Sequence, residues 1–274
     1  MPEKPEVITV AKKLKNKLLD RKIKSVKVFY PTMIEYPTVE ELKKGVSGQE
    51  IHDITTRGKW IVLTLDESYL LFHLRMEGKF FFRTKDDEIN KHEHVIFTLD
   101  DDTELRFADV RKFAKIMLIP KDKIFTMKPY TELGLEPWDK NLTPAYLKEK
   151  FENKKMPIKT ALLDQSIIAG IGNIYADEIL FLSRINPLTK ALDLTDKNLS
   201  DIIENTVKVL DKAVSEGGTT IRSYTSEEGV TGLFQNDLNV HQREHEKCRI
   251  CGSIIEKIRV GGRGTYFCPK CQKK

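Results

Sequence analysis

The chain has 274 residues, of which 40% are hydrophobic and 32% charged, and its net charge is +5. This length accommodates two domains, and the composition is that of a globular protein rather than a disordered or fibrous one. No apolar run approaches the length that spans a bilayer, so we expect no membrane association. The first residues include Pro2, Glu3, Lys4 and Glu6. This polar start is unlike a secretory signal, and we predict a cytoplasmic protein.

The first half of the chain opens with a helical pattern and continues as strands. The predicted helix has one apolar face, formed by Val7, Val10, Ala11, Leu14 and Leu18. Strands are predicted at Ser25–Tyr30, Lys59–Leu65, Tyr69–Arg83, His94–Leu99 and Glu104–Ile119, with a hairpin turn at Asp100–Thr103. Because no long helix separates these strands, they predict an antiparallel sandwich or barrel.

The second half has a helical pattern. We predict helices at Pro144–Asn153, Ile158–Ser166, Asn173–Ser183 and Leu194–Glu216. Gly217 and Gly218 end the last helix, and the polar segment Thr219–Gly232 follows as a loop. We therefore divide the chain into an N-terminal β domain of residues 1–130, a helical domain of residues 131–240 and a terminal segment of residues 241–274.

The terminal segment contains every cysteine of the chain. Cys248, Cys251, Cys268 and Cys271 form two C-x2-C pairs separated by sixteen residues. This spacing is typical of structural zinc, and four thiolates complete a tetrahedral Zn2+ without an open position for catalysis. Two disulfides are the alternative, although no export signal supports them. We predict one structural zinc ion.

Positive charge is concentrated in the same segment. Residues 247–274 include eight lysines or arginines and one glutamate, whereas the rest of the chain has two more acidic than basic residues. A basic tail on a nearly neutral body is typical of nucleic-acid binding. A merely solvated tail is the alternative, but a bound metal would hold this segment in place.

A glycine-rich turn precedes one of the predicted helices. In the segment Ile167–Glu178, Gly170 and Gly172 form the turn, and Asn173 falls at the expected N-cap. A helix N-terminus after such a turn presents free N–H groups that bind a phosphate. On this motif alone, a helix hairpin without a ligand is the better interpretation.

Taken together, these motifs resemble those of bacterial formamidopyrimidine-DNA glycosylases, which repair oxidised purines. The resemblance extends from Met1–Val7 to Arg263–Gln272 and so covers essentially the whole chain. It implies an α+β fold, with an N-terminal antiparallel β-sandwich flanked by a helix. A helical domain with a helix–two-turn–helix motif and a β-hairpin zinc ribbon would follow.

The resemblance also implies which residues perform catalysis. Removal of Met1 would expose the secondary amine of Pro2, which attacks C1′ of the damaged nucleoside and becomes an iminium after base loss. A retained Met1 would block this amine. Glu3 lies beside it as the proton donor or shuttle. Arg263, at the tip of the zinc hairpin, would bind the flanking phosphates through its planar pair of donors.

Two further residues are expected to support this chemistry. Lys59 starts a predicted strand, where an exposed lysine is the ordinary interpretation, but the resemblance makes it a phosphate contact and an acid or base helper. Glu6 lies one helical turn beyond Glu3 and would hold the chain terminus. A solvent-exposed first-turn glutamate, favoured by the helix dipole, is the alternative for Glu6.

A damaged base must leave the duplex before it can react, and a side chain then fills the gap. The resemblance implies that Met76 fills the gap left by the extruded base. It also implies that Arg111 and Phe113 read the orphan cytosine and kink the duplex. Without the resemblance, Met76 and Phe113 would be predicted to pack in the strand core.

Other residues match contacts to the DNA backbone, which supply affinity rather than sequence choice. These residues are His92, Lys155, Lys159 and Asn173, and the loop Thr219–Gly232 corresponds to the part that covers an extruded oxidised guanine. A metal site is the alternative for the pair His92 and His94, but no third ligand is evident. Solvated charge is the alternative for the two lysines.

The chain departs from the family pattern at two places. Lys4 and Ile8 replace the usual leucine and glutamate. Val240–Arg243 reads Val-His-Gln-Arg where Val-Tyr-Gly-Arg or Val-Tyr-Gly-Lys is usual. Neither departure changes a residue with an expected chemical role. The second lies in the linker to the zinc ribbon, so it bears on DNA affinity more than on activity.

We therefore predict a monomeric, bacterial, nucleoid-associated DNA glycosylase and AP lyase. It would remove 8-oxoguanine and formamidopyrimidines from double-stranded DNA through a Pro2 Schiff base and β,δ-elimination. Two alternatives remain. One is an endonuclease VIII-like glycosylase for oxidised pyrimidines, against which Met76, Arg111 and Phe113 argue. The other is a zinc-ribbon protein that binds damaged DNA without cutting it.

Overall fold

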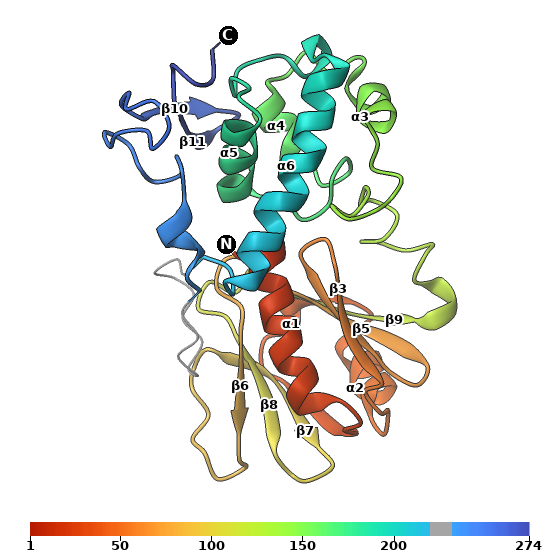
Figure 1. Cartoon of the computed structure of the whole chain (residues 1–274). Helices are drawn as coiled ribbons and strands as arrows, with labels where there is room; N and C mark the ends of the chain where they lie inside the picture. Colours follow the sequence, from red (N-terminus) through yellow and green to blue (C-terminus); the bar gives the residue numbers. More distant parts are fainter. Residues whose placement is uncertain (220–231, 274) are drawn as a thin grey trace. The chain divides into compact units, whose positions relative to one another are not determined.

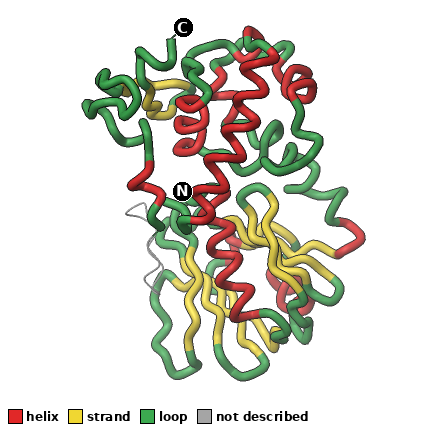
Figure 2. Tube along the Cα trace, viewed as in Figure 1, coloured by secondary structure: helices red, strands yellow, loops and turns green. Residues whose placement is uncertain are grey.

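The computed structural model describes residues 1–219 and 232–273 (Figure 1). The described residues form two compact units, one of residues 1–131 and one of residues 132–219 and 232–273. Strands dominate the first unit and helices the second, as Figure 2 shows. No helix in the described part of the chain is both long and apolar enough to cross a bilayer.

The described residues of the first unit form two sheets, two α-helices and two short 3-10 helices. Its α-helices are α1 (Lys4–Leu18) and α2 (Val39–Val46), and its strands are β1 (Ile23–Val28), β2 (Ile34–Tyr36), β3 (Asp53–Arg57), β4 (Trp60–Thr64), β5 (Ser68–His73), β6 (Lys79–Arg83), β7 (Glu93–Leu99), β8 (Glu104–Ala108) and β9 (Lys115–Pro120). One sheet has the order β1-β7-β8-β6 and the other the order β2-β9-β5-β4-β3. The predicted mixed fold with an N-terminal β domain is confirmed.

The core of this unit lies between α1 and the two sheets. The apolar face of α1 buries Val7, Leu14 and Leu18 in one cluster with residues of both sheets, among them Phe72 and Phe97. Aromatic edges fill the space between the sheets, with the Phe72 and Phe97 ring centroids 5.8 Å apart. Because α1 packs at this core, the chain terminus is fixed to the sheets.

Several local features differ from the predicted pattern. The segments Tyr69–Arg83 and Glu104–Ile119 were each expected as one strand, but each forms two strands separated by a turn or loop. β2 pairs with β9 in parallel, so the five-stranded sheet is not purely antiparallel. Helix α2 was not expected, although Thr38 and Glu41 form a capping box that marks its start.

The second unit contains four α-helices and a two-stranded hairpin. Its elements are α3 (Pro144–Phe151), α4 (Ile158–Leu162), α5 (Asn173–Leu182), α6 (Asp196–Ser215), β10 (Glu256–Val260) and β11 (Arg263–Phe267). All four helices were predicted, but α4 ends four residues earlier than expected. The predicted loop Thr219–Gly232 has residues 220–231 outside the described part of the chain.

A fully buried arginine joins the strands of the four-stranded sheet to the segment before β7. The guanidinium of Arg106 pairs with the carboxylates of Glu93 and Glu104 at 3.0 and 2.8 Å. It also donates to the carbonyls of Thr84, Asp87 and Glu88 at 2.8–3.0 Å. Loss of this guanidinium would leave two buried carboxylates and three carbonyls without their hydrogen-bond donor. Removing one partner of a buried ion pair is strongly destabilising, because the remaining charge is buried and uncompensated.

We therefore expect Arg106→Leu to lower the free energy of unfolding by about 3–5 kcal/mol, measured by urea titration. The matched control is Lys24→Ala, because the pair between Lys24 and Asp102 is half-exposed on both sides. We expect this control to change stability by less than about 1 kcal/mol. Equal effects of the two substitutions would show that the buried network does not stabilise the sheet.

Candidate active site and nucleic-acid contacts

The first residues of the chain are buried and held by hydrogen bonds. Glu3 and Glu6 are only 3% and 6% exposed, and the Glu6 carboxylate accepts the backbone N–H of Glu3 at 2.8 Å. The ammonium of Lys4, at the start of α1, donates to Thr56 Oγ1 in β3 at 3.0 Å. The chain start is thus attached both to its own helix and to the neighbouring strand.

Charged groups of both signs surround the terminal amine. Burial lowers the pKa of the Met1 amine below its ordinary value, although the carboxylates of Glu3 and Glu6 act in the opposite direction. Lys59 and Arg111 lower this pKa further. An amine must lose its proton to act as a nucleophile, so burial and nearby cations at the start of the chain favour the deprotonated form of the Met1 amine.

Lys59 lies in the turn between β3 and β4, one residue before the strand that it was expected to start. Gly58 supplies the positive φ of +53° that this tight turn requires. The Lys59 side chain is 7% exposed, so the interpretation as an exposed strand residue does not hold. The turn brings Lys59 within electrostatic reach of the chain terminus.

The turn between β5 and β6 presents Met76. Met76 is half-buried and lies outside both strands, so it does not occupy the strand-core position that was the alternative. The tight turn needs Gly78, because a Cβ there would lie 2.8 Å from the carbonyl oxygen of Leu74. His73 fixes the turn by accepting the Arg75 backbone N–H at Nδ1, 3.0 Å away.

His73 was not identified from the sequence, since a single histidine within an apolar strand gives no signal. Burial lowers its pKa to about 3, and Arg75 and Lys59 act in the same direction. His73 therefore stays neutral near neutral pH, which keeps Nδ1 available as an acceptor. Its ring meets the edge of the Trp60 ring with centroids 5.0 Å apart.

Arg111 and Phe113 lie in the loop between β8 and β9 and face solvent. Phe113 is 52% exposed, and the Arg111 guanidinium lies over its ring, 5.0 Å from the centroid. The structure thus places these two residues together and excludes core packing for Phe113. His92 is near this loop, since its carbonyl accepts the backbone N–H of Asp109 at 3.0 Å.

The second unit corrects two expectations. The N-cap of α5 is Gly172 rather than Asn173, and the Asn173 amide donates instead to the carbonyl of Gly264 at 3.0 Å. Lys159 is completely buried, pairs with Asp177 and donates to the Asn173 carbonyl at 3.2 Å. The prediction of Lys159 as a phosphate contact was wrong, because its ammonium is enclosed within the protein.

Other members of the predicted set lie at the surface of the second unit. Lys155 is exposed just before α4. Arg263 is exposed at the first position of β11, beside the turn Gly261–Gly262. A Cβ on Gly261 would lie 2.6 Å from Thr160 Oγ1, and its φ is +55°, so glycine is required where the hairpin turn meets α4. The close approach fixes the hairpin turn that precedes Arg263.

The departure from the family pattern at His241 forms part of a buried network. His241 is 5% exposed, and its Nδ1 lies 2.7 Å from an oxygen of Asp177, whose other oxygen meets Lys159. The neighbouring carboxylate of Glu178 accepts the backbone N–H groups of Asn239, Val240 and His241 at 2.8–3.0 Å. The network therefore joins α4, α5 and the linker before the zinc segment.

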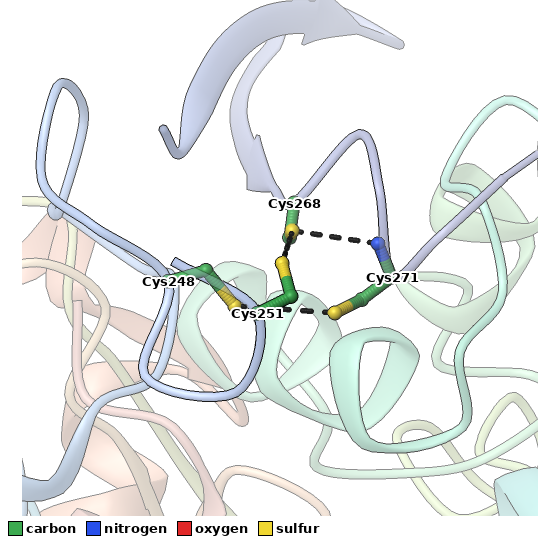
Figure 3. A group of neighbouring side chains, drawn as sticks. All are labelled: Cys248, Cys251, Cys268 and Cys271. Carbon is green, nitrogen blue, oxygen red and sulfur yellow. Dashed lines mark hydrogen bonds between the residues drawn. The ribbon is translucent and has the colours of Figure 1, made fainter. Parts of the chain in front are cut away.

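The four cysteines converge, as Figure 3 shows. Their sulfurs all lie within 4.8 Å of one another, and the Cys248–Cys271 and Cys251–Cys268 separations are 4.0 and 3.4 Å. Tetrahedral zinc with bonds of about 2.3 Å places sulfurs about 3.8 Å apart. A disulfide needs about 2.05 Å. The donor set fits one structural Zn2+, and disulfides are excluded as the state of these thiols.

Among the described residues, the four cysteines are the only group of potential ligands that could hold a metal ion. His94, the other member of the histidine pair, has its Nε2 3.0 Å from the carbonyl of Asp109. The fold and the site therefore define a protein with a zinc ribbon and a glycine turn before a helix, joined to a β unit whose amine terminus is half-buried. A metal-held basic segment and a helix N-terminus after a glycine turn are features of nucleic-acid-binding proteins.

The comparison with family models covers most of the chain. Residues 1–116 match the formamidopyrimidine-DNA glycosylase N-terminal domain, and residues 133–225 match the H2TH domain of the same enzymes. Residues 246–274 match the zinc finger found in FPG and IleRS.

Relatives that match over the full length of the chain belong to the same family as the matched family models. The chain is 47% identical over 274 residues to the formamidopyrimidine-DNA glycosylase of Exiguobacterium sibiricum, covering 100% of this chain and 99% of that one. It is 43% identical to the enzyme of Bacillus cereus, with 100% of both chains covered. A Lactococcus lactis FPG mutant solved with Fapy-dG DNA matches with a TM-score of 0.93, 38% identity and 100% of both chains covered.

The chain belongs to the formamidopyrimidine-DNA glycosylase family. Members of this family are bifunctional DNA glycosylases and AP lyases, and the protein is a DNA-binding base-excision repair enzyme. The zinc-finger match and the convergent cysteines together establish one structural zinc ion.

Loss of zinc should release the hairpin from the second unit. We expect Cys268→Ser to lower the zinc content from about one ion per chain and to weaken DNA binding about ten-fold or more. Elemental analysis and fluorescence anisotropy would measure the two effects. Ile250→Ala, in the same loop but with an exposed side chain, is the control. Unchanged DNA affinity in a zinc-free protein would contradict the role of the metal.

Proposed function

We propose that the protein removes 8-oxoguanine and formamidopyrimidines from double-stranded DNA and then cuts the strand by β,δ-elimination. The observation that carries this proposal is the start of the chain, where Pro2 and Glu3 are buried and the half-buried Met1 amine lies within electrostatic reach of Glu3, Glu6 and Lys59. The likeness to the L. lactis FPG mutant solved with Fapy-dG DNA supports the substrate class.

The proposed chemistry begins when Met1 is removed and the Pro2 nitrogen becomes a secondary amine. Its lone pair forms a bond to C1′, and the glycosidic bond breaks with its electrons passing to the base. The Pro2 nitrogen then loses its proton, and the C1′–O4′ bond breaks with its electrons passing to O4′, which takes up a proton, so that an iminium forms at C1′ of the opened sugar. The iminium draws electrons from C2′, so that loss of a C2′ proton expels the 3′ phosphate, and loss of a further sugar proton in a second elimination expels the 5′ phosphate. Glu3 supplies and accepts the protons of these steps, with Lys59 as a helper that also contacts phosphate.

Glu6 is proposed to support this arrangement rather than to react. Its carboxylate is committed to the backbone N–H of Glu3 and so fixes the orientation of the residue that transfers protons. The buried position of both residues supports the assignment, because neither is free to sample many conformations.

We propose a separate role in DNA binding for the exposed residues. Met76 fills the gap left by the extruded base, Arg111 and Phe113 meet the orphan base and the kinked step, and His92 contacts a phosphate. In the second unit Lys155, Arg263 and the N-terminal N–H groups of α5 at Asn173 bind the backbone. The Arg111 guanidinium lies over the Phe113 ring, which supports the proposal that the two side chains contact the same part of the DNA. The proposed cover of the extruded base, the loop Thr219–Gly232, lies mostly outside the described residues.

We also propose the division into a catalytic β domain of residues 1–130, a helical domain of residues 131–240 and a zinc ribbon of residues 241–274. The enzyme would act as a monomer on nucleoid DNA in the cytoplasm, without a membrane partner. The substrate class supports this location, because the chromosome is where oxidised purines require repair.

Borohydride trapping tests the proposed mechanism. We expect protein without Met1 to form a covalent adduct with a duplex containing 8-oxoguanine opposite cytosine, because reduction converts the iminium to a stable amine. Protein that retains Met1, verified by intact mass, should form little or no adduct while it still binds the duplex. An absent adduct with processed protein and intact binding would instead favour damage recognition without cutting.

Oxidised pyrimidines are a second candidate substrate. A wild-type L. lactis FPG has been solved with DNA containing an oxidised pyrimidine, and it matches this chain with a TM-score of 0.91 and 37% identity. Release of thymine glycol faster than 8-oxoguanine under single-turnover conditions would assign the protein to pyrimidine repair.

A further inference from the structure

The loop between β8 and β9 is built around one buried carboxylate. Asp109 is 1% exposed, although Val110 and Phe113 in the same loop are 57% and 52% exposed. Its Oδ1 accepts the backbone N–H of Arg111 at 3.0 Å, and its Oδ2 accepts those of Phe113 and Ala114 at 2.8 Å each. A single side chain thus binds the backbone of almost the whole loop.

The main chain of Asp109 extends these contacts to its neighbours. Its N–H donates to the carbonyl of His92 at 3.0 Å, and its carbonyl accepts from the Lys112 N–H at 3.3 Å. The ring of His94, which is 4% exposed, binds the same carbonyl through Nε2 at 3.0 Å. Asp109 is therefore the common partner of the backbone at His92, Arg111 and Phe113.

The loop needs such an anchor because its own conformation is unfavourable. Lys112 adopts a φ of +59°, which side-chain-bearing residues adopt rarely, and no glycine is present between Asp109 and Ala114. A charged acceptor forms the stronger class of hydrogen bond, so the carboxylate offsets this strain. Without it, three backbone donors would need other partners, and the loop would sample several conformations.

We propose that Asp109 is a positioning residue for recognition of the base opposite the lesion. It holds the backbone of Arg111 and Phe113 so that the stacked guanidinium and ring are already in place when DNA arrives. Contacts that are fixed in advance give sharper discrimination, because a loose contact adapts to the wrong partner as well. This inference rests on the proposed reading role of Arg111, which is tested separately below.

The test measures single-turnover rates on two duplexes, with 8-oxoguanine opposite cytosine or opposite adenine. The variants are Asp109→Ala, Asp109→Asn, Arg111→Ala and the double variant of Asp109→Ala with Arg111→Ala. Asp101→Ala is the matched control, because the Asp101 carboxylate also holds a turn, accepting the Thr103 N–H at 3.0 Å, at the other end of β8. Thermal unfolding of each variant reports any general loss of stability.

We expect Asp109→Ala to reduce the preference for cytosine about ten-fold, the scale of one lost base contact. Its rate on saturating cytosine-paired substrate should change far less. Asp109→Asn should lose less of the preference, because an amide oxygen at the Oδ2 position keeps the Phe113 and Ala114 bonds. The double variant should show no greater loss than Arg111→Ala, since Asp109 acts through Arg111.

The outcomes separate the two claims. If Arg111→Ala keeps the full preference, the proposed reading role of Arg111 fails. If Arg111→Ala loses the preference while Asp109→Ala keeps it and only lowers the melting temperature, as Asp101→Ala does, the positioning role of Asp109 is overturned. Should Asp109→Ala not fold, Asp109→Asn decides the question, and an unchanged preference in that variant overturns the proposal.

Discussion

The hydrogen bond from the Glu3 backbone N–H to the Glu6 carboxylate, 2.8 Å long, fixes the residues on which the proposed chemistry depends. A chain terminus normally frays, because few contacts hold it. Here the bond joins the terminus to the first turn of α1, and the apolar face of that helix lies in the core of both sheets. The packing of α1 against the sheets therefore fixes the position of the start of the chain, where the proposed nucleophile lies.

The same kind of interaction recurs in two other irregular segments. Asp109 holds the loop of Arg111 and Phe113, and Glu178 accepts three successive N–H groups in the linker before the zinc ribbon. A carboxylate is suited to this task because its oxygens accept several bonds at once, and N–H groups paired in this way no longer need water. These segments are thus held by hydrogen bonds to a carboxylate rather than by regular secondary structure.

The sequence predicted the parts whose signals are local. The C-x2-C pairs, the helical spacing of Val7 to Leu18 and the glycine turn before α5 were each recognised from a few neighbouring residues. Some of the failures involve partners distant in sequence. Lys159 resembled a surface cation, but its partner Asp177 is eighteen residues away, and the parallel pairing of β2 with β9 joins residues about eighty apart. Asp109 and His73 instead bind backbone N–H groups two to five residues further along the chain, but a single aspartate or histidine at such a position is not a specific sequence signal.

The central claim is that the terminal amine, rather than a lysine, attacks the damaged nucleoside. Lys59 is the natural competitor, since its own amine is buried and lies within electrostatic reach of the terminus. The most direct measurement is to reduce the adduct with borohydride, digest it and locate the attached sugar by tandem mass spectrometry. The account predicts attachment to the nitrogen of Pro2 in the N-terminal peptide. Attachment to Nζ of Lys59, with an unmodified Pro2, would contradict it.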